Sequence, residues 1–343
     1  MKIVYRILPW LLLAVFATEI IAVLMPKRDG AFHVRAWGRL PVLLNGRIQP
    51  FDSVGRNVLL QIRGTGDVPL AEKKAWQFWK HPPKLRSSEW LLEVMTRPER
   101  AAERPIFLIH HPELMDELNL RGKGIEKSGL FYFTFNEIKP ALDKINQQGS
   151  QAGQVEAPLR TAYQKQAIQL ANAVMLYHRL KNSLRPENMD DFAQELAEFE
   201  KAIPLGLAAV RAREAGKEFD KEAFDRLLTP LNRFNEMANL AYPLIVPLLD
   251  AGTVNEKWAN AGVALMDTVH SGTIHPAIKH FAAMATAYRH ENVEAFNGAV
   301  ADYQAWLAPH FATELSKGRA EFYYNDVKAF LHAMIIYLCA FLL

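Results

Sequence analysis

Residues 39–56 read RLPVLLNGRIQPFDSVGR and contain two structural signals in one short stretch. The Asn-Gly pair at 45–46 lies between two apolar runs, which is the sequence pattern of a tight β-hairpin turn. The hairpin is followed by a predicted helix that begins near Asp52, whose carboxylate favours the positive end of the helix dipole. Arg47 and Arg56 either form ion pairs with Asp52 or bind a propionate or another carboxylate.

The surrounding segment, residues 27–146, mixes strand and helix signals. Residues 105–110 (PIFLIH) and 130–135 (LFYFTF) are short apolar runs that predict buried strands. Residues 88–95, between the hairpin and the first of these strands, predict a helix. We therefore expect a mixed α/β subdomain over residues 27–146.

Helical periodicity dominates the rest of the aqueous chain. Residues 147–154, QQGSQAGQ, predict a polar linker, and a helical subdomain over 147–326 follows it. Apolar residues at 4-3-4-3 spacing over 163–184, and again over 192–203, predict an antiparallel helical hairpin whose second helix Pro204 should end or kink. Further helices are predicted over 221–240, 257–268, 276–288 and 293–322. The predicted fold class is mainly α with a small β element (α+β).

The two ends of the chain are strongly apolar. Residues 7–25, ILPWLLLAVFATEIIAVLM, are long enough to cross a hydrocarbon core of roughly 30 Å as a helix. We predict an N-terminal transmembrane anchor over residues 1–26, with a cleaved secretory signal as the alternative. Residues 327–343, VKAFLHAMIIYLCAFLL, predict the start of a second, incomplete transmembrane helix, after which we expect a multi-span membrane region. A tail anchor or a buried core helix is the alternative for this segment.

Ionisable residues lie inside both apolar segments. Glu19 is costly in lipid unless it is protonated, paired or buried, so it predicts packing against other membrane helices or a position near the outer interface. His332 is either a haem-ligand candidate or a histidine at the wet interface. We expect the chain to lie in the cytoplasmic (inner) membrane, with the large loop of residues 27–326 on the extracytoplasmic, periplasmic side.

The composition excludes several classes of function. Forty Lys and Arg residues against 37 Asp and Glu give a net charge of +3, too even for a chain that grips nucleic acid through its phosphates. The single cysteine, Cys339, excludes an internal disulfide framework and Cys-cluster metal sites. The chain has no Gly-rich phosphate loop, nucleophile elbow or HExxH motif, so no catalytic residue is predicted.

Histidines and tryptophans give two weaker signals. His270, His275 and His280 suggest a metal site, but residues five apart do not share a helix face, and surface or helix-capping roles are the alternative. Trp76 and Trp79 are at helical spacing and either stack on a flat cofactor or pack in a core or at a membrane surface.

Two stretches resemble long forms of the CcsA-type cytochrome c biogenesis proteins, part of the System II haem-attachment machinery. Residues 38–56 resemble the opening of the family's extracytoplasmic domain, and residues 321–330, EFYYNDVKAF, resemble the point where that domain returns to the membrane. Gly55, where the family often has Ala, and Lys328-Ala329, where a Pro is expected, depart from the pattern. The residues that match the motifs, for which we expect a structural role, are Gly46, Arg47, Pro50, Asp52, Arg56, Glu321, Tyr324 and Asn325.

The resemblance implies haem handling. Such proteins carry haem to the outer face of the membrane and present it for attachment to apocytochrome c. Haem is therefore the expected cofactor of the full-length protein, with His332 as the candidate ligand in this segment, and none is expected for the aqueous loop alone. The expected partners are membrane lipid, apocytochrome c and other assembly proteins, and not nucleic acid.

Two other functions are compatible with the sequence. The first is a membrane-anchored helical scaffold that recruits a protein partner without a cofactor. The second is a membrane enzyme that uses His270, His275 and His280 as a metal site.

Overall fold

The computed structural model describes residues 2–25, 27–70, 83–127, 129–187, 189–240, 242–249 and 257–342. Most of these residues are helical, and the strands form small antiparallel sheets. The predicted α+β class with a small β element is therefore confirmed. The predicted Trp76–Trp79 pair lies outside the described residues.

Helices and strands alternate along the first half of the chain, and helices make most of the second half. The first half contains α1 (Lys2–Leu24), α2 (Val34–Gly38), β1 (Pro41–Leu44), β2 (Arg47–Pro50), α3 (Phe51–Arg63), β3 (Asp67–Pro69), β4 (Lys84–Arg86), α4 (Ser87–Thr96), α5 (Pro98–Ala101), β5 (Phe107–Ile109), α6 (Pro112–Glu117), β6 (Ile125–Lys127), β7 (Leu130–Phe133), α7 (Phe135–Ile138) and the 3-10 turn η1 (Lys139–Ala141). The second half contains α8 (Leu142–Gly153), η2 (Ala157–Leu159), α9 (Ala162–Lys181), α10 (Phe192–Glu214), α11 (Lys221–Leu240), β8 (Val246–Pro247), β9 (Trp258–Ala259), α12 (Ala261–Ser271), α13 (Pro276–Arg289), α14 (Val293–His310), α15 (Ala312–Val327) and α16 (Ala329–Leu342).

The predicted hairpin and strands are confirmed. β1 and β2 pair antiparallel, and the turn residues Asn45 and Gly46 have φ of 52° and 73°. This left-handed backbone at both turn positions matches the twist of the flanking strands. Residues 107–109 and 130–133 form β5 and β7, which pair antiparallel in the sheet β5-β7-β6.

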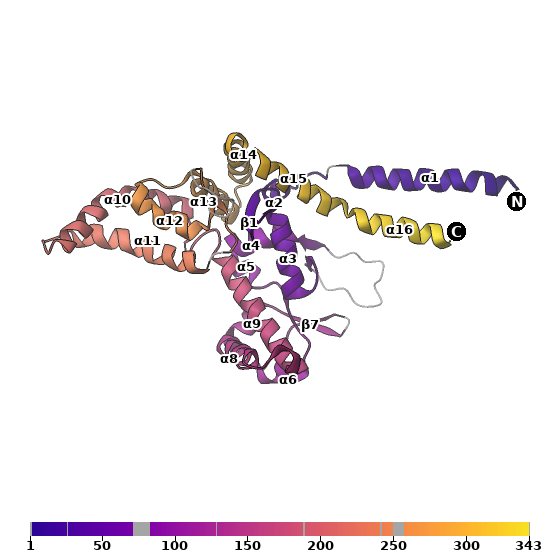
Figure 1. Cartoon of the computed structure of the whole chain (residues 1–343), viewed down its shortest axis with the longest axis horizontal. Helices are drawn as coiled ribbons and strands as arrows, with labels where there is room; N and C mark the ends of the chain where they lie inside the picture. The colour runs from indigo at the N-terminus through magenta and orange to yellow at the C-terminus, as the bar shows by residue number, and fades with distance from the viewer. Residues whose placement is uncertain are drawn as a thin grey trace.

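The predicted hairpin between the helices of 163–184 and 192–203 is wrong. α9 packs against α8, and α10 packs against α11. In Figure 1 these two pairs form separate arms that leave the central body in different directions. The apolar stripes do mark buried faces, but a stripe identifies the face that a helix buries and not the helix that covers it.

The predicted linker at 147–154 is also wrong, because α8 runs from 142 to 153. Ile145, Gly149 and Ala152 are its buried residues. A Cβ on Gly149 would lie 2.5 Å from the Cβ of Ala171 in α9, so the glycine allows the two helices to approach closely. The expected boundary between residues 27–146 and 147–326 therefore falls inside a helix.

Of the two predicted effects of Pro204, ending the helix is wrong, since α10 continues to Glu214. A proline in a helix interior costs about 3 kcal/mol. Packing against α11 offsets this cost: Ile203 is buried, and a Cβ on Gly206 would lie 2.5 Å from the Cβ of Leu227.

One hydrophobic core joins the two halves of the chain. Trp37 of α2 stacks on Phe51 of α3 with ring centroids 4.4 Å apart, and Phe51 meets Phe281 of α13 edge-on at 6.1 Å. Phe107 of β5 meets Tyr177 of α9 at 5.5 Å. These aromatic contacts hold α2 and α3 against α13, and β5 against α9.

The terminal helices α1 and α16 extend from the same side of the body (Figure 1). Many of their apolar side chains are exposed, among them Trp10, Leu13, Ile21, Phe330, Tyr337 and Phe341. Within the part of the chain that the structure describes, no helix combines the length and the apolarity needed to span a bilayer.

The close contact of α8 with α9 predicts opposite effects for two glycines of the same helix. Gly149→Ala should lower the free energy of unfolding by about 1–3 kcal/mol, because the new methyl group overlaps Ala171. Gly153→Ala, where a Cβ meets nothing within 4 Å, should raise it by about 0.5–1 kcal/mol. Denaturant titration of the full chain in detergent measures both, and an equal effect of the two substitutions would show that α8 does not pack as described.

Candidate functional site

The two motif stretches meet at one place in the structure. Both terminal nitrogens of Arg47 in β2 donate to Glu321 of α15, each over 2.9 Å. Glu321 Oε1 also accepts from Ser53 Oγ of α3 at 2.6 Å, and Ser53 Oγ accepts from Asn325 Nδ2 at 2.9 Å. We call these four residues, Arg47, Ser53, Glu321 and Asn325, the junction. It connects β2, α3 and α15 through polar side chains.

A close backbone approach places α15 at the junction. A Cβ on Gly318 would lie 2.5 Å from the carbonyl oxygen of Arg39, just before β1. Residues three and four apart share one face of a helix. Glu321 and Asn325 therefore lie on the same face as Gly318, and this face is turned toward the hairpin and α3.

Asp52 connects α3 to α4 beside the junction. It is buried, its Oδ1 accepts from Ser87 Oγ at 2.8 Å, and its Oδ2 accepts from Arg56 Nη2 at 3.1 Å. The predicted pairing of Arg56 with Asp52 is confirmed, whereas Arg47 pairs with Glu321 instead. Sequence proximity favoured Asp52 as the partner of Arg47, but the fold brings a carboxylate from the other end of the chain to it.

α3 begins at Phe51, so Asp52 lies in its first turn, as predicted, but does not cap the helix. Its N-cap is Pro50, and no side chain caps it, so Asp52 acts through its contacts with Ser87 and Arg56 from the first turn. A Cβ on Gly55 would lie 2.5 Å from the carbonyl oxygen of Ser87, so the glycine lets α3 touch the start of α4. The departure from the family pattern at Gly55 thus has a steric reason in this fold.

Asp326 ties the end of α15 to α2. Its Oδ2 accepts from Arg35 Nη2 at 2.8 Å, and Lys27 Nζ lies 3.5 Å from its Oδ1. Burial alone would raise the pKa of Asp326, but the hydrogen bond and charge of Arg35, with the charges of Lys27 and Arg86, hold this pKa below its ordinary value. The Arg35 guanidinium also lies over the Phe322 ring, 5.1 Å from its centroid.

The structure separates the predicted motif residues into groups. Arg47, Glu321 and Asn325 belong to the junction, and Asp52 and Arg56 form the neighbouring ion pair. Gly46, Pro50 and Tyr324 lie outside these contacts: Gly46 is in the hairpin turn, Pro50 precedes α3, and Tyr324 is half exposed beside Phe330.

Four residues of the site were not predicted from the sequence: Arg35, Ser53, Ser87 and Asp326. Ser53 and Asp326 stand directly beside motif residues, so this adjacency was a usable signal. Arg35 and Ser87 had no such signal, because their partners are distant in sequence.

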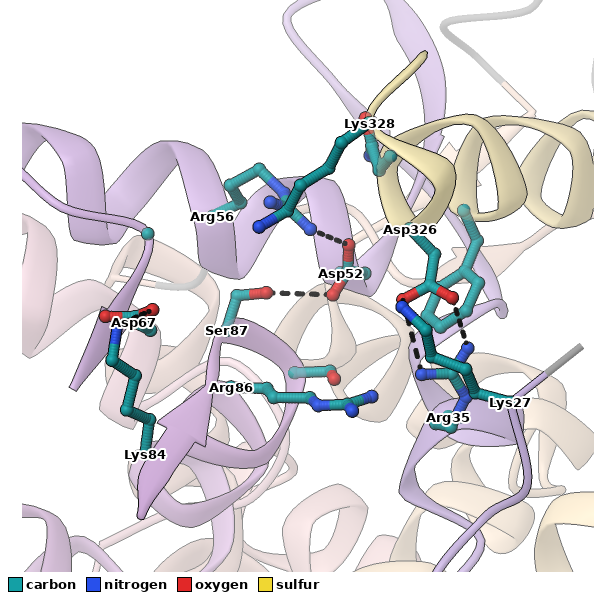
Figure 2. A pocket seen from close by; sticks show the side chains of 14 residues that line it. Lys27, Arg35, Asp52, Arg56, Asp67, Lys84, Arg86, Ser87, Asp326 and Lys328 are labelled. Carbon is teal, nitrogen blue, oxygen red and sulfur yellow. Dashed lines mark hydrogen bonds and ion pairs between the residues drawn. The ribbon is translucent and has the colours of Figure 1, made fainter. Parts of the chain in front are cut away.

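A charged cavity of about 250 Å³ opens beside the junction, with Asn325 in its wall. Its cationic lining residues are Lys27, Arg35, Arg56, Lys84, Arg86 and Lys328. Its carboxylates are Asp52, Asp67 and Asp326, and each of them is ion-paired. We call this space the cationic cavity (Figure 2).

His332, the predicted haem-ligand candidate, lies on α16 opposite α1. Its Nδ1 is 3.5 Å from Oε1 of Glu19, and its side chain is about a quarter exposed. Tyr323 Oη also donates to the carbonyl oxygen of Leu24 at 3.3 Å. The acid that the sequence places in an apolar helix thus has a partner on a second apolar helix.

The histidines near residue 275 do not gather into one site. His275 caps α13 by accepting from the Ala277 N–H at its Nδ1 over 3.2 Å, while His270 is exposed at the end of α12. His280 lies against Tyr303 and Trp306. Burial lowers the pKa of both His275 and His280. Among the described residues, no three His, Cys, Asp or Glu side chains are placed to hold a metal ion.

No family model, curated protein or solved structure matches the chain.

The lowered pKa of Asp326 predicts a pH dependence of stability. The unfolded chain takes up this proton at a higher pH than the folded protein does. The stability that the carboxylate contributes is therefore fully present above its ordinary pKa of 3.8 and is lost as the pH falls through the folded pKa. Asp326→Asn should be less stable than the wild type at neutral pH, and the difference should shrink in acid.

Denaturant titrations between about pH 6 and pH 2 test this prediction. The wild type should lose more unfolding free energy than Asp326→Asn over that range. Parallel pH profiles for the two proteins would contradict the assigned role of the Arg35–Asp326 pair.

Proposed function

We propose that this chain is the accessory extracytoplasmic domain of a membrane protein of cytochrome c assembly, of the CcsA type. In this proposal the whole protein delivers or attaches haem to apocytochrome c at the outer face of the cytoplasmic membrane. The junction is the observation that carries the proposal. Motif residues from both ends of the aqueous chain, which resemble one family, contact one another at the base of the terminal helices.

Membrane insertion of the terminal helices is the second part of the proposal. Exposed side chains such as Trp10, Phe330 and Phe341 would be unfavourable in water, because apolar area costs about 25 cal/mol per Å² there. Lys27 follows α1 and Lys328 precedes α16, so a cation flanks each apolar helix at its aqueous end. Both features support lipid as the surroundings of α1 and of α16.

The proposed role of the aqueous domain is to hold a fixed position above the membrane. A bidentate Arg–carboxylate pair fixes orientation as well as distance. Glu321 and Asn325 are on α15, which leads into α16, and their partners are on β2 and α3. The junction thus couples α16 to the body of the aqueous domain. Such rigid coupling is what a domain that positions a partner protein requires.

His332 is the haem-ligand candidate in this proposal. Its Nδ1 faces the Glu19 carboxylate at 3.5 Å, which leaves Nε2 available to a metal. Ligating histidines usually donate their second ring N–H to such a carboxylate or to a carbonyl group. The haem, when bound, would be the group that is attached to apocytochrome c.

Replacing His332 tests the haem part of the proposal. The chain is produced in a cell membrane and extracted with detergent, and its absorption spectrum is recorded. We expect a haem Soret band that His332→Ala reduces about tenfold, because the substitution removes an iron ligand. His290→Ala is the matched control, since His290 is exposed at the end of α13, and it should leave the band unchanged.

The same preparation tests membrane attachment. The chain should remain with the membranes after an alkaline carbonate wash and come off only with detergent. A chain that remains but carries no haem would support the alternative, a membrane-anchored scaffold that recruits a protein partner without a cofactor. A chain that washes off would refute both functions.

A further inference from the structure

The cationic cavity holds more positive than negative charge. The three carboxylates among its described lining residues are already shared among Lys27, Arg35, Arg56 and Lys84. Arg86 and Lys328 line the same cavity, and neither has an ion-pair partner in the described ranges of the chain. Like charges gathered this closely repel one another unless an anion compensates them.

Buried donors in the cavity wall also lack acceptors. The Arg35 side chain is 9% exposed, and its Nε has no hydrogen-bond acceptor among the described residues. Arg56 Nε is likewise buried without an acceptor there. A buried N–H without a partner is destabilising, so the cavity offers unused donors as well as unbalanced charge.

The position of the cavity favours one source for the anion. Lys27 follows α1 and Lys328 precedes α16, so the cavity lies at the base of both apolar helices. Figure 2 shows the Lys328 side chain reaching toward Arg56, and Arg86 extending toward Arg35 and Lys27. If the terminal helices enter lipid, these side chains lie at the level of the headgroups.

We propose that the cationic cavity binds the phosphate group of an anionic phospholipid headgroup. This inference rests on the membrane attachment given under Proposed function. Phosphate oxygens accept several charge-assisted hydrogen bonds from Arg and Lys at once, and basic pockets beside membrane helices attract anionic lipid.

The size and lining of the cavity fit a headgroup better than a porphyrin. Its volume of about 250 Å³ is below the roughly 300–1,000 Å³ of pockets that enclose drug-sized ligands. Among the lining residues that the structure describes, Phe322 is the one with an aromatic ring, and the guanidinium groups of Arg35 and Arg39 lie over that ring.

Calorimetric titration of the full chain in neutral detergent micelles tests the inference. The probes are short-chain phosphatidylglycerol, short-chain phosphatidylcholine and inorganic phosphate. Phosphatidylglycerol should bind saturably and at least tenfold more tightly than phosphatidylcholine, whose choline is repelled by the cavity. Inorganic phosphate should bind more weakly than phosphatidylglycerol, because it lacks acyl chains that contact α1 and α16.

Two variants locate the site. Arg86→Gln and Lys328→Gln change exposed residues that form no ion pair within the described ranges, so the fold should persist, which circular dichroism checks. Each should weaken phosphatidylglycerol binding about fivefold, and both together about 25-fold. Lys165→Gln, an exposed lysine on α9, is the matched control and should leave the affinity unchanged.

Three outcomes would overturn the inference: equal affinity for the two lipids, unchanged affinity in both single variants, or inorganic phosphate binding as tightly as phosphatidylglycerol. Membrane attachment is measured separately by the carbonate wash. A chain that resists the wash but does not prefer phosphatidylglycerol refutes the lipid site alone, whereas a chain that washes off refutes the proposed function.

Discussion

One carboxylate, that of Glu321, joins the two ends of the aqueous chain. It accepts hydrogen bonds from Arg47 and from Ser53, and so it joins a strand and a helix near the start of the chain to a helix near its end. Other contacts between α15 and the start of the chain accompany it: Asn325 donates to Ser53, Asp326 pairs with Arg35, and Gly318 lies close to the carbonyl oxygen of Arg39. The two terminal helices also contact each other and their flanking segments through His332 and Glu19, and through Asp326 and Lys27.

Packing and charge support this polar contact from two sides. In the hydrophobic core, Trp37 stacks on Phe51 and Phe51 meets Phe281 edge-on, and these contacts join α2, α3 and α13. Beside it, Arg35 and Asp326 anchor the end of α15 one turn before the chain enters α16. The His332–Glu19 contact and the cationic cavity are consequences of this arrangement, because both require the two chain ends to leave the body together.

Some local sequence signals predicted local structure, whereas the single helices predicted over 257–268 and 293–322 are, respectively, a strand followed by a helix and two helices. The Asn-Gly turn at 45–46 and the helix over 221–240 appear as expected, because backbone geometry and apolar spacing are properties of short segments. Partner choice was not predictable: α9 packs against α8 rather than against α10, and Arg47 is paired with Glu321 rather than with the nearby Asp52. The polar run at 147–154 is helical because Gly149 serves close packing, which composition alone does not reveal.

Cysteine crosslinking between α3 and α15 tests the junction most directly. In a Cys339→Ala background, Ser53→Cys and Asn325→Cys place two thiols where side-chain atoms lie 2.9 Å apart in the wild type. Mild oxidation should give a disulfide-linked peptide joining positions 53 and 325 in most chains, and none for Ser53→Cys with Asp225→Cys on the distant α11. Absence of the 53–325 crosslink in the folded protein would contradict the account.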